Sequence, residues 1–451
     1  MFETVLIANR GEAACRVIRT LRKHGIRSIA IASDNDMTAR HAREADEVIP
    51  LGGEAPADTY LNVAKVIQAA RTSGAQAIHP VFGFLAENAA AAKAIRAAGL
   101  AFVGPSTEAI AAMADKIRSR ILAGRAGLAV SRGSEEPILT VEDAKKAAAS
   151  IGYPIMIKPS SGGGGIGMVV AKDESELVKA VDSTLKRALR LFGDPALLLE
   201  EFVSNARHIE VQVLGLADGT IIPLGERDCT AQRRYQKVAE ESPSPAVASD
   251  LRRHLIDAAK TFSQALGYQG VGTVEFLVDQ VQEKFVFLEM NTRLQVEHPV
   301  TELVTGLDLV WEQLLVAAGD DPSFSPADPP TSSGHCIEVR VCAEDPVTFR
   351  PAPGRIERWE VPSGVGIRVD DGYAAGDAVS PYYDSLLAKL CAVGADRPEA
   401  VERLATAIDA FVIEGPRSNL PFFQKLLRHP AFVDGSYGSD IVTRIVEGSR
   451  R

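Results

Sequence analysis

The chain has 451 residues, of which 46% are hydrophobic and 24% are charged, and its formal net charge is −10. This length predicts several structural units, since domains usually hold roughly 100–200 residues, and the acidic balance argues against a partner such as duplex nucleic acid. The five cysteines form no CxxC pair, and no apolar stretch approaches the roughly 20 residues that span a bilayer, so we expect reduced thiols in a cytoplasmic protein without a membrane partner.

The first third of the chain alternates short apolar strands with amphipathic helices. We expect strands at residues 4–8, 28–32, 76–79 and 101–104, and helices at 11–24, 61–72 and 87–98, which is typical of a parallel α/β layer. The first strand–helix turn lacks GxGxxG, which argues against a dinucleotide site there. The loop at 79–88 follows a strand end, where α/β sheets place ligands, so Phe82 and Phe84 either face a ligand or pack in the core.

A glycine-rich loop lies between two apolar runs, residues 151–158 and 168–171. It is not a dinucleotide fingerprint, because it leads into a strand and not into a helix, and the chain contains no Gly-Lys pair of a Walker A loop. Glycine N–H groups in such a hairpin can form a nest for phosphate oxygens, and Lys158 can add a point charge. We therefore expect a mobile lid over a phosphate site, with a flexible linker as the alternative.

Two central stretches carry polar patterns. Residues 208–213 alternate polar and apolar side chains, which predicts a strand with one wet face that includes His208 and Glu210. A lone histidine of this kind is more often structural than catalytic. Residues 227–237 concentrate cations, which is typical of a solvated face or of an anion site.

The segment at 275–299 carries the strongest functional pattern. Two strand-like runs, 273–278 and 285–289, flank a polar turn, and pairing Val278 with Val286 would place Glu275 opposite Glu289. Like charges directly opposite on a sheet are destabilising, so we expect a cation between them, and Mg²⁺ takes carboxylate oxygens. If the chain stays extended, strand alternation collects the polar side chains that follow on one face. These are Glu289, Asn291, Arg293, Gln295 and Glu297. The alternative is a polar sheet face in water.

Beyond a Pro-, Ser- and Asp-rich linker at 320–333, residues 335–343 alternate as a strand. Glu338 and Arg340 share one face of it. Arg340 either forms an ion pair within the sheet or points at a reacting centre as a fixed cation. Residues 381–390 form a turn and then a strand or helix, and residues 398–412 form an amphipathic helix.

Several motifs together resemble one family. They are ERDC at 226–229, QRRYQK at 232–237, EMNTRLQVEHPVTE at 289–302, AEDP at 343–346 and PYYDS at 381, with IANRGEAACRVIR near residue 7. In these the chain resembles, almost end to end, the biotin carboxylase component of biotin-dependent carboxylases. The resemblance implies a mixed α/β (α+β) ATP-grasp fold with a Rossmann-like N-terminal domain at 1–113. It further implies an ATP-grasp start at 114–203 with the mobile lid at 131–203, a core with the metal and bicarbonate site at 204–330, and a biotin carboxylase C-terminal domain at 331–445.

The resemblance also implies roles for individual residues. Phosphates would be held by Lys116, Lys158, Gly163, Gly164, Gly165 and His208, and the adenine by Glu200, Glu201, Phe202 and Val203. Mg²⁺ or Mn²⁺ on the ATP phosphates would be bound by Glu275, Glu289 and Asn291. The bicarbonate pocket would consist of Lys237, Arg293, Gln295 and Val296. Glu297 would be the base that deprotonates bicarbonate, Arg340 would stabilise the biotin enolate, and Phe82 would line the biotin side.

By this resemblance the chain is expected to be a ligase that uses ATP and bicarbonate to carboxylate biotin, through carboxyphosphate. It would serve an acyl-CoA (acetyl or propionyl) carboxylase of fatty acid biosynthesis. Because the family's Met-Lys-Met biotin attachment motif is absent, we expect either that the carrier protein and the carboxyltransferase are separate chains or that the sequence is a fragment, and family members are often homodimers.

Some positions depart from the family pattern. Ile166 stands where an arginine is common, Val81-Phe82 where Gly-Tyr is common, and Tyr235 where histidine is frequent. Three alternatives therefore stay open: a component of a urea-type or pyruvate-type carboxylase, a catalytically impaired nucleotide-binding subunit, or an ATP-grasp carboxylate–amine ligase.

Overall fold

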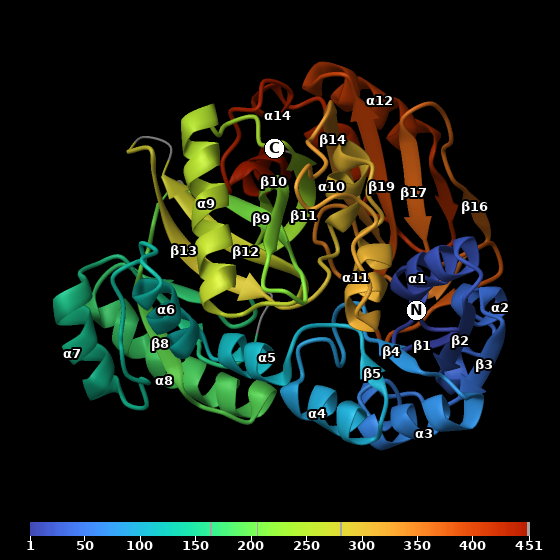
Figure 1. Cartoon of the computed structure of the whole chain (residues 1–451). Coiled ribbons are helices and arrows are strands. Elements are labelled where there is room, and N and C mark those ends of the chain that lie inside the picture. Colours follow the sequence, from blue (N-terminus) through green and yellow to red (C-terminus); the bar gives the residue numbers. More distant parts are fainter. Residues whose placement is uncertain (163–164, 205, 280–281, 449–451) are drawn as a thin grey trace.

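The structure is a computed structural model that describes residues 1–162, 165–204, 206–279 and 282–448. The N-terminal unit is a parallel sheet in the order β3-β2-β1-β4-β5, with helices on its faces (Figure 1). Its strands are β1 (Thr4–Ile7), β2 (Arg27–Ala32), β3 (Glu47–Pro50), β4 (Ala77–His79) and β5 (Ala101–Phe102). Its helices are α1 (Gly11–Lys23), α2 (Arg40–Glu44), α3 (Val63–Ser73) and α4 (Ala89–Ala97). The predicted parallel layer is confirmed; the short strand β3 was not predicted.

A smaller sheet of three strands, in the order β7-β6-β8, forms the unit that carries the glycine-rich loop. Its strands are β6 (Ile155–Pro159), β7 (Val169–Ala171) and β8 (Leu197–Glu201). Helices α7 (Val141–Ile151) and α8 (Glu174–Phe192) cover it, while α5 (Thr107–Ala114) and α6 (Lys116–Arg125) connect it to the N-terminal unit. The strand expected from residue 151 begins later, because α7 extends to Ile151. Gly163 and Gly164 lie outside the described residues.

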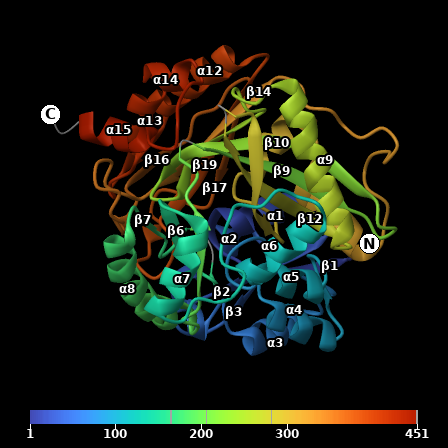
Figure 2. The ribbon, with the colours of Figure 1, turned by 90° about the vertical axis from the view of Figure 1, so that its left-hand side faces the viewer.

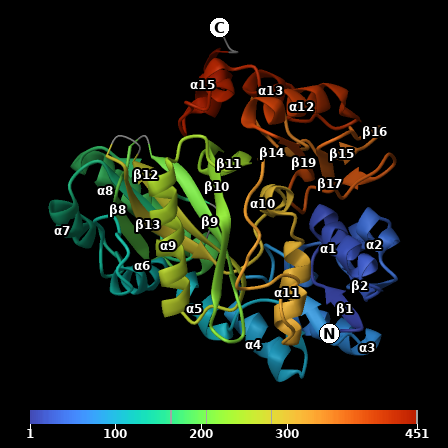
Figure 3. The same ribbon diagram turned by 45° about the horizontal axis from the view of Figure 1, so that its top comes forward.

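The largest element is an antiparallel sheet in the order β13-β12-β9-β10-β11-β14-β19-β17, which continues across the linker at 320–333 (Figures 1 and 3). Its first strands are β9 (Arg207–Gly215), β10 (Ile221–Arg233), β11 (Gln236–Ser242), β12 (Gly270–Asp279) and β13 (Lys284–Asn291). Those after the linker are β14 (His335–Cys342), β17 (Ile367–Asp371) and β19 (Leu386–Gly394). The pairing of β11 with β14 therefore joins the expected core and the expected C-terminal domain in one sheet.

Helices cover this sheet according to its alternation. On β9, Ile209 and Val211 pack in the core under α9 (Ser249–Ala265), while Glu210 lies on the opposite face of the strand. On β14, Ile337 and Val339 pack under α12 (Arg397–Ala410), which leaves Arg340 on the opposite face. The predicted polar faces of both strands are thus confirmed, and they carry the candidate site.

The remaining elements complete the C-terminal third (Figure 2). The helices are α10 (His298–Thr305), α11 (Leu309–Ala318), α13 (Leu420–Leu426), α14 (Pro430–Val433) and α15 (Ile441–Gly448). The short strands are β15 (Gly354–Arg355), β16 (Arg358–Glu360), β18 (Ala378–Val379) and β20 (Val412–Glu414). Among the described residues, no helix combines the length and the apolar character that crossing a membrane requires. All five cysteines are free thiols, as expected.

A buried carboxylate fastens the C-terminal helices to the central sheet. Glu241 on β11 accepts hydrogen bonds from Arg397 (2.7 Å) and the Tyr437 hydroxyl (2.6 Å), and His335 Nε2 lies 2.6 Å from it. Burial alone raises the pKa of a carboxyl group, but the bonds from His335 and Arg397 outweigh it and lower the pKa of Glu241 from 4.5 to about 2.

We predict that Glu241→Gln destabilises the protein by about 3 kcal/mol at pH 7, the value of a pKa lowered from 4.5 to about 2. Because the folded pKa is depressed, this stability is fully present above pH 4.5 and is lost as pH falls towards 2. Melting temperatures measured against pH should show a gap between wild type and variant that narrows below pH 4.5. The exposed Glu360→Gln serves as the control, and a gap that stays constant down to pH 3 would contradict the assignment.

Candidate active site

One lysine holds three carboxylates together. The ammonium of Lys237 on β11 lies 2.6 Å from Glu210, 2.9 Å from Glu275 and 2.6 Å from Glu297. These partners come from β9, β12 and the residue before α10. Burial alone lowers the pKa of a lysine, but the surrounding acidic groups outweigh it and hold the pKa of Lys237 well above its ordinary value. Lys237 is therefore a permanent cation at the meeting point of three segments.

The two carboxylates predicted to face each other do so. Glu275 is paired with Glu289, but the assumed pairing of Val278 with Val286 is wrong, because Val278 lies opposite Phe285. A register shift between Glu275 and Phe276 nevertheless brings Glu275 opposite Glu289. The Glu275 carboxylate has several partners, since His208 Nε2 and Asn291 Nδ2 each lie 2.8 Å from it, whereas the Glu289 carboxylate has no hydrogen bond or ion pair within the described ranges.

The charges of this pair favour a divalent cation. Burial and the neighbouring Glu275 raise the pKa of Glu289, whereas Lys237 and His208 outweigh burial and lower the pKa of Glu275 well below its ordinary value. An unpartnered carboxylate, a second carboxylate and the Asn291 carbonyl oxygen form the all-oxygen donor set that Mg²⁺ takes. The donor chemistry therefore fits the ion that the facing glutamates predict.

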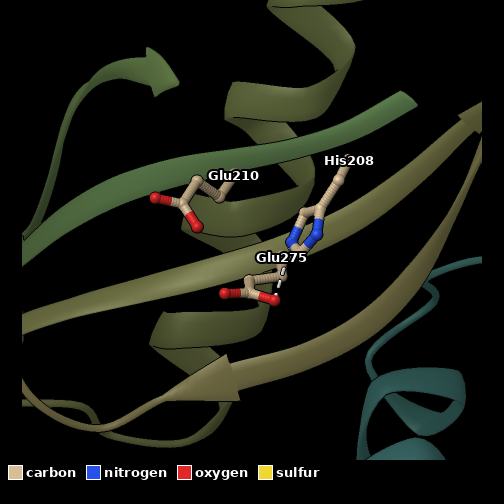
Figure 4. A group of neighbouring side chains, drawn as sticks. All are labelled: His208, Glu210 and Glu275. Atoms are coloured by element: carbon tan, nitrogen blue, oxygen red, sulfur yellow. Dashed lines mark hydrogen bonds and ion pairs between the residues drawn. The ribbon is translucent and has the colours of Figure 1, made fainter. Parts of the chain in front are cut away.

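A second cluster of possible ligands lies beside this pair. His208, Glu210 and Glu275 have ligand atoms within 4.8 Å of one another, and Figure 4 shows the imidazole pointing at Glu275. The ammonium of Lys237 contacts both glutamates and Arg227 also pairs with Glu210 at 2.5 Å, so two cations already face these two carboxylates. His208 Nδ1 lies 2.7 Å from the Gln232 amide nitrogen, which leaves Nε2–H to donate to Glu275.

The segment after β13 is not extended as expected. The strand ends at Asn291, and Glu297 lies in a turn before α10, so the predicted alternation fails beyond Asn291. The polar side chains still converge, because Arg293 donates to Gln295 (3.0 Å) and to Asn291 (3.1 Å). Gln295 in turn donates to Glu275 at 3.2 Å. Side-chain hydrogen bonds, and not strand alternation, therefore bring these polar side chains together.

Glu297 is a fully buried carboxylate between two cations. One of its oxygens meets Lys237 and the other lies 2.9 Å from Arg340. Burial raises the pKa of Glu297, but Lys237 and Arg340 outweigh it and the pKa is lowered, so the group is ionised at neutral pH. Arg340 also pairs with Glu240 at 2.6 Å, and not with Glu338 on its own strand. This brings a basic oxygen and a fixed guanidinium into contact.

Two lysines predicted to bind phosphates already contact groups of the unit that carries the glycine-rich loop. Lys158 is paired with Glu200, which also contacts Arg120 at 2.8 Å, and Lys116 donates to the Gly162 carbonyl. Burial lowers the pKa of Lys116. A side chain on Gly165 would come within 2.6 Å of the Tyr235 Cβ, so the lid backbone rests on the β10–β11 turn.

Two N–H groups of the expected adenine segment are already hydrogen-bonded within the protein. The N–H of Glu201 donates to Arg132 and that of Phe202 donates to Pro154, at 2.8 and 3.0 Å. Within the described residues the N–H of Val203 has no backbone partner. A hydrogen bond from this segment to a base therefore has to come from Val203 and not from the two N–H groups before it.

Two residues near the site were not predicted as site residues. Glu87 accepts from Arg293 at 2.8 Å, and the sequence offered a hint of it, since it lies in the loop at 79–88. Glu240 gave no such hint, because it meets Arg340 only through the pairing of β11 with β14. The departures lie outside the Lys237 cluster: Ile166 is 51% exposed, Tyr235 is 38% exposed, and Phe82 is partly buried against the core.

Comparisons with known proteins agree along the whole chain. Residues 1–110 match the family described as biotin carboxylase, N-terminal domain, and residues 338–446 match the biotin carboxylase C-terminal domain. Residues 115–323 match the carbamoyl-phosphate synthase L chain, ATP binding domain.

Individual relatives span the same length. Biotin carboxylase 1 of Bacillus subtilis (strain 168) is 45% identical over 440 residues, which cover 97% of this chain and 98% of that protein. A pyruvate carboxylase subunit of Methanothermobacter thermautotrophicus is 42% identical over 452 residues, which cover 100% of this chain and 91% of that protein. The biotin carboxylase domain dimer of Hydrogenobacter thermophilus 2-oxoglutarate carboxylase, solved with MgADP, ADP and bicarbonate, has a TM-score of 0.96, 41% identity and 99% coverage of both chains.

We predict that Lys237→Met destabilises the protein by about 3–5 kcal/mol at pH 7, because it leaves buried carboxylates without their shared cation. In this variant the pKa of a cluster carboxyl group rises above its unfolded value, so the loss should shrink as pH falls towards 4.5 and a proton replaces the missing charge. Thermal melts of both proteins at several pH values measure this. Lys186→Met, at an exposed pair with Asp182, should change stability little, and a Lys237→Met loss that grows on acidification would refute the electrostatic account.

Proposed function

The chain belongs to the biotin carboxylases, the ATP-dependent ligase components of biotin-dependent carboxylases, and we propose that it carboxylates biotin on a carrier protein with bicarbonate and ATP. One observation carries this proposal for the site. The ionised carboxylate of Glu297 lies between Lys237 and Arg340, and Lys237 also contacts Glu275, which faces Glu289 on the next strand. The reaction needs a base, fixed cations and a nucleotide-metal site close together, and these side chains offer all three residue types.

Activation of bicarbonate is the first chemical task. Bicarbonate would bind against Lys237, Arg293, Gln295 and the Val296 backbone, within reach of Glu297. Glu297 takes the bicarbonate proton as general base, which typically accelerates a step by roughly 10²–10⁴-fold. A bicarbonate oxygen then forms a bond to the γ-phosphorus of ATP while the bond to ADP breaks, and the product is carboxyphosphate. Lys237 and Arg293 stabilise the negative charge of the transferring group without reorganising.

The nucleotide would lie under the glycine-rich lid. Lys116, Lys158, His208 and the backbone of residues 163–165 would contact its phosphates, and the segment 200–203 its adenine. Glu275, Glu289 and Asn291 would hold Mg²⁺ or Mn²⁺. When bound, such an ion neutralises phosphate charge and aligns the γ-phosphoryl group with its acceptor.

Transfer to biotin completes the reaction. Carboxyphosphate separates into CO₂ and phosphate, the phosphate takes the N1′ proton of biotin, and the nitrogen forms its bond to CO₂. Negative charge moves to the ureido oxygen during this step, where the guanidinium of Arg340 stabilises it. The carboxylate of Glu240 lies 2.6 Å from the Arg340 guanidinium and holds it in position for this role. Phe82 would line the biotin side.

We propose that the final carboxyl acceptor is acetyl-CoA or propionyl-CoA, so that the chain serves an acyl-CoA carboxylase. Its support is that mitochondrial propionyl-CoA carboxylase alpha chains, such as that of Rattus norvegicus, share 44% identity over 98% of this chain. Pyruvate-type and urea-type carboxylases are the alternatives. A biotin carrier protein and a carboxyltransferase are the proposed partners, and a homodimer is the proposed assembly, as in the Hydrogenobacter domain dimer.

We predict that Glu297→Gln lowers bicarbonate-dependent ADP release, measured with free biotin, by roughly 10²–10⁴-fold, since the amide cannot accept the proton. ATP binding, followed by calorimetry, should persist, and Glu360→Gln should match the wild type. An unchanged rate would remove Glu297 from the role of base. Wild-type ATP binding without turnover would instead favour a catalytically impaired protein, and hydroxylamine trapping of an acyl phosphate from another acid would favour a carboxylate–amine ligase.

The acceptor is tested by reconstitution. Pull-down from the native host should recover a biotinylated carrier and a carboxyltransferase, and the assembled complex should carboxylate acetyl-CoA or propionyl-CoA with ¹⁴C-bicarbonate. Incorporation into pyruvate or urea, with none into either acyl-CoA, would replace the acyl-CoA proposal and leave the biotin carboxylase reaction intact.

A further inference from the structure

Lys389 on β19 is a fully buried lysine in an unfavourable place. It is 0% exposed, and in the sheet it lies directly opposite Arg340 on β14 and Asp370 on β17. Two cations directly opposite each other destabilise a sheet, and an apolar residue of similar volume usually costs less than a buried ion. Asp370 is an anion, but it already pairs with Arg19 and Arg368 at 2.7 Å each, so the sheet alone does not account for a lysine here.

The contacts of Lys389 join three distant parts of the chain. Its ammonium donates to the carbonyl of Val296 at 3.1 Å and lies 3.1 Å from the carboxylate of Glu12, in the first turn of α1. It also lies 5.8 Å from the centre of the Phe82 ring. The carboxylate of Glu12 is itself buried and has no hydrogen-bond partner within the described residues, and Lys389 is its one ion-pair partner there.

The carbonyl of Val296 lies in the turn that presents Glu297. The neighbouring carbonyls of this turn are bound locally: that of Leu294 by Arg293 at 3.3 Å, and that of Gln295 by His298 Nδ1 at 2.8 Å. Val296 differs, because its donor comes from a strand 93 residues away. The direction of this peptide unit is therefore set by Lys389 and not by the turn itself.

We propose that Lys389, held by Glu12, is a positioning residue that orients the Val296–Glu297 peptide of the bicarbonate pocket. The ammonium holds the Val296 carbonyl and with it the peptide that leads into Glu297, whose side chain meets Lys237 and Arg340. This inference rests on the proposed function, because it refines the site in which bicarbonate would be deprotonated. It also explains why α1 of the N-terminal unit packs against β19.

Three variants separate positioning from stability. Lys389→Met and Glu12→Gln each leave one buried charge without its partner, so both should lower the melting temperature. The double variant Glu12→Gln/Lys389→Met removes both charges and should recover most of the melting temperature. It still lacks a donor to Val296, so its kcat/KM for bicarbonate should stay reduced by roughly 10²-fold, as expected for a misplaced reacting group, while the KM for ATP is unchanged.

A matched control comes from another buried ion pair. Arg10 and Asp36 lie 2.7 Å apart in the N-terminal unit, and Arg10→Met/Asp36→Asn should change stability without changing the KM for bicarbonate. If the Glu12→Gln/Lys389→Met variant recovers both its melting temperature and its bicarbonate kinetics, the pair is only structural and the inference is overturned.

Hydrogen–deuterium exchange gives a readout that does not depend on activity. The peptide spanning residues 294–300 should exchange faster in Glu12→Gln/Lys389→Met than in the wild type, and at the wild-type rate in Arg10→Met/Asp36→Asn. A wild type without bicarbonate-dependent turnover would defeat the proposed function but not this exchange difference. Unchanged exchange in an otherwise active enzyme would defeat the positioning role alone.

Discussion

The contact of one ammonium with three carboxylates is the constraint on which the site depends. One ammonium cannot balance the negative charge of Glu210, Glu275 and Glu297 alone, so other cations contribute. Arg227 contacts Glu210 at 2.5 Å and Arg340 contacts Glu297 at 2.9 Å. Each strand must therefore hold its register, since a slip by one residue would turn its carboxylate to the other face of the sheet.

The continuous sheet brings Lys237 and Arg340, which are proposed to act in different steps of the reaction, close together. Lys237 lies on β11 and Arg340 on β14, and these strands pair directly although about 100 residues separate them. Glu240 on β11 meets Arg340 at 2.6 Å across this seam. The sequence linker at 320–333 marks a change in composition and not a break in the sheet, so the residues proposed for bicarbonate activation and for biotin carboxylation lie on one continuous sheet.

Local patterns were predictable and long-range pairings were not. Strand alternation depends only on neighbouring residues, so the polar faces that carry Glu210 and Arg340 followed from the sequence. The register of β12 with β13 did not, because a shift near Glu275 is decided by packing and leaves no signal in composition. Glu240 and Lys389 were missed for the same reason, since each gains its partner from a distant segment. The roles of the site residues rest on the family resemblance and on the geometry together.

The depressed pKa of Glu297 implies that, in the proposed reaction, bicarbonate must bind before Glu297 can act as its base. A carboxylate paired with Lys237 and Arg340 is a weak proton acceptor, because both cations favour its ionised form. An anion bound at Lys237 and Arg293 competes for the Lys237 charge, and each hydrogen bond that it withdraws from Glu297 raises the basicity of that carboxylate. In the proposed reaction the site would thus gain its base as bicarbonate binds, whereas water, which carries no charge, would leave Glu297 paired with its two cations. This coupling requires Lys237 to be shared between the base and the pocket, and the 2.6 Å contact places it there.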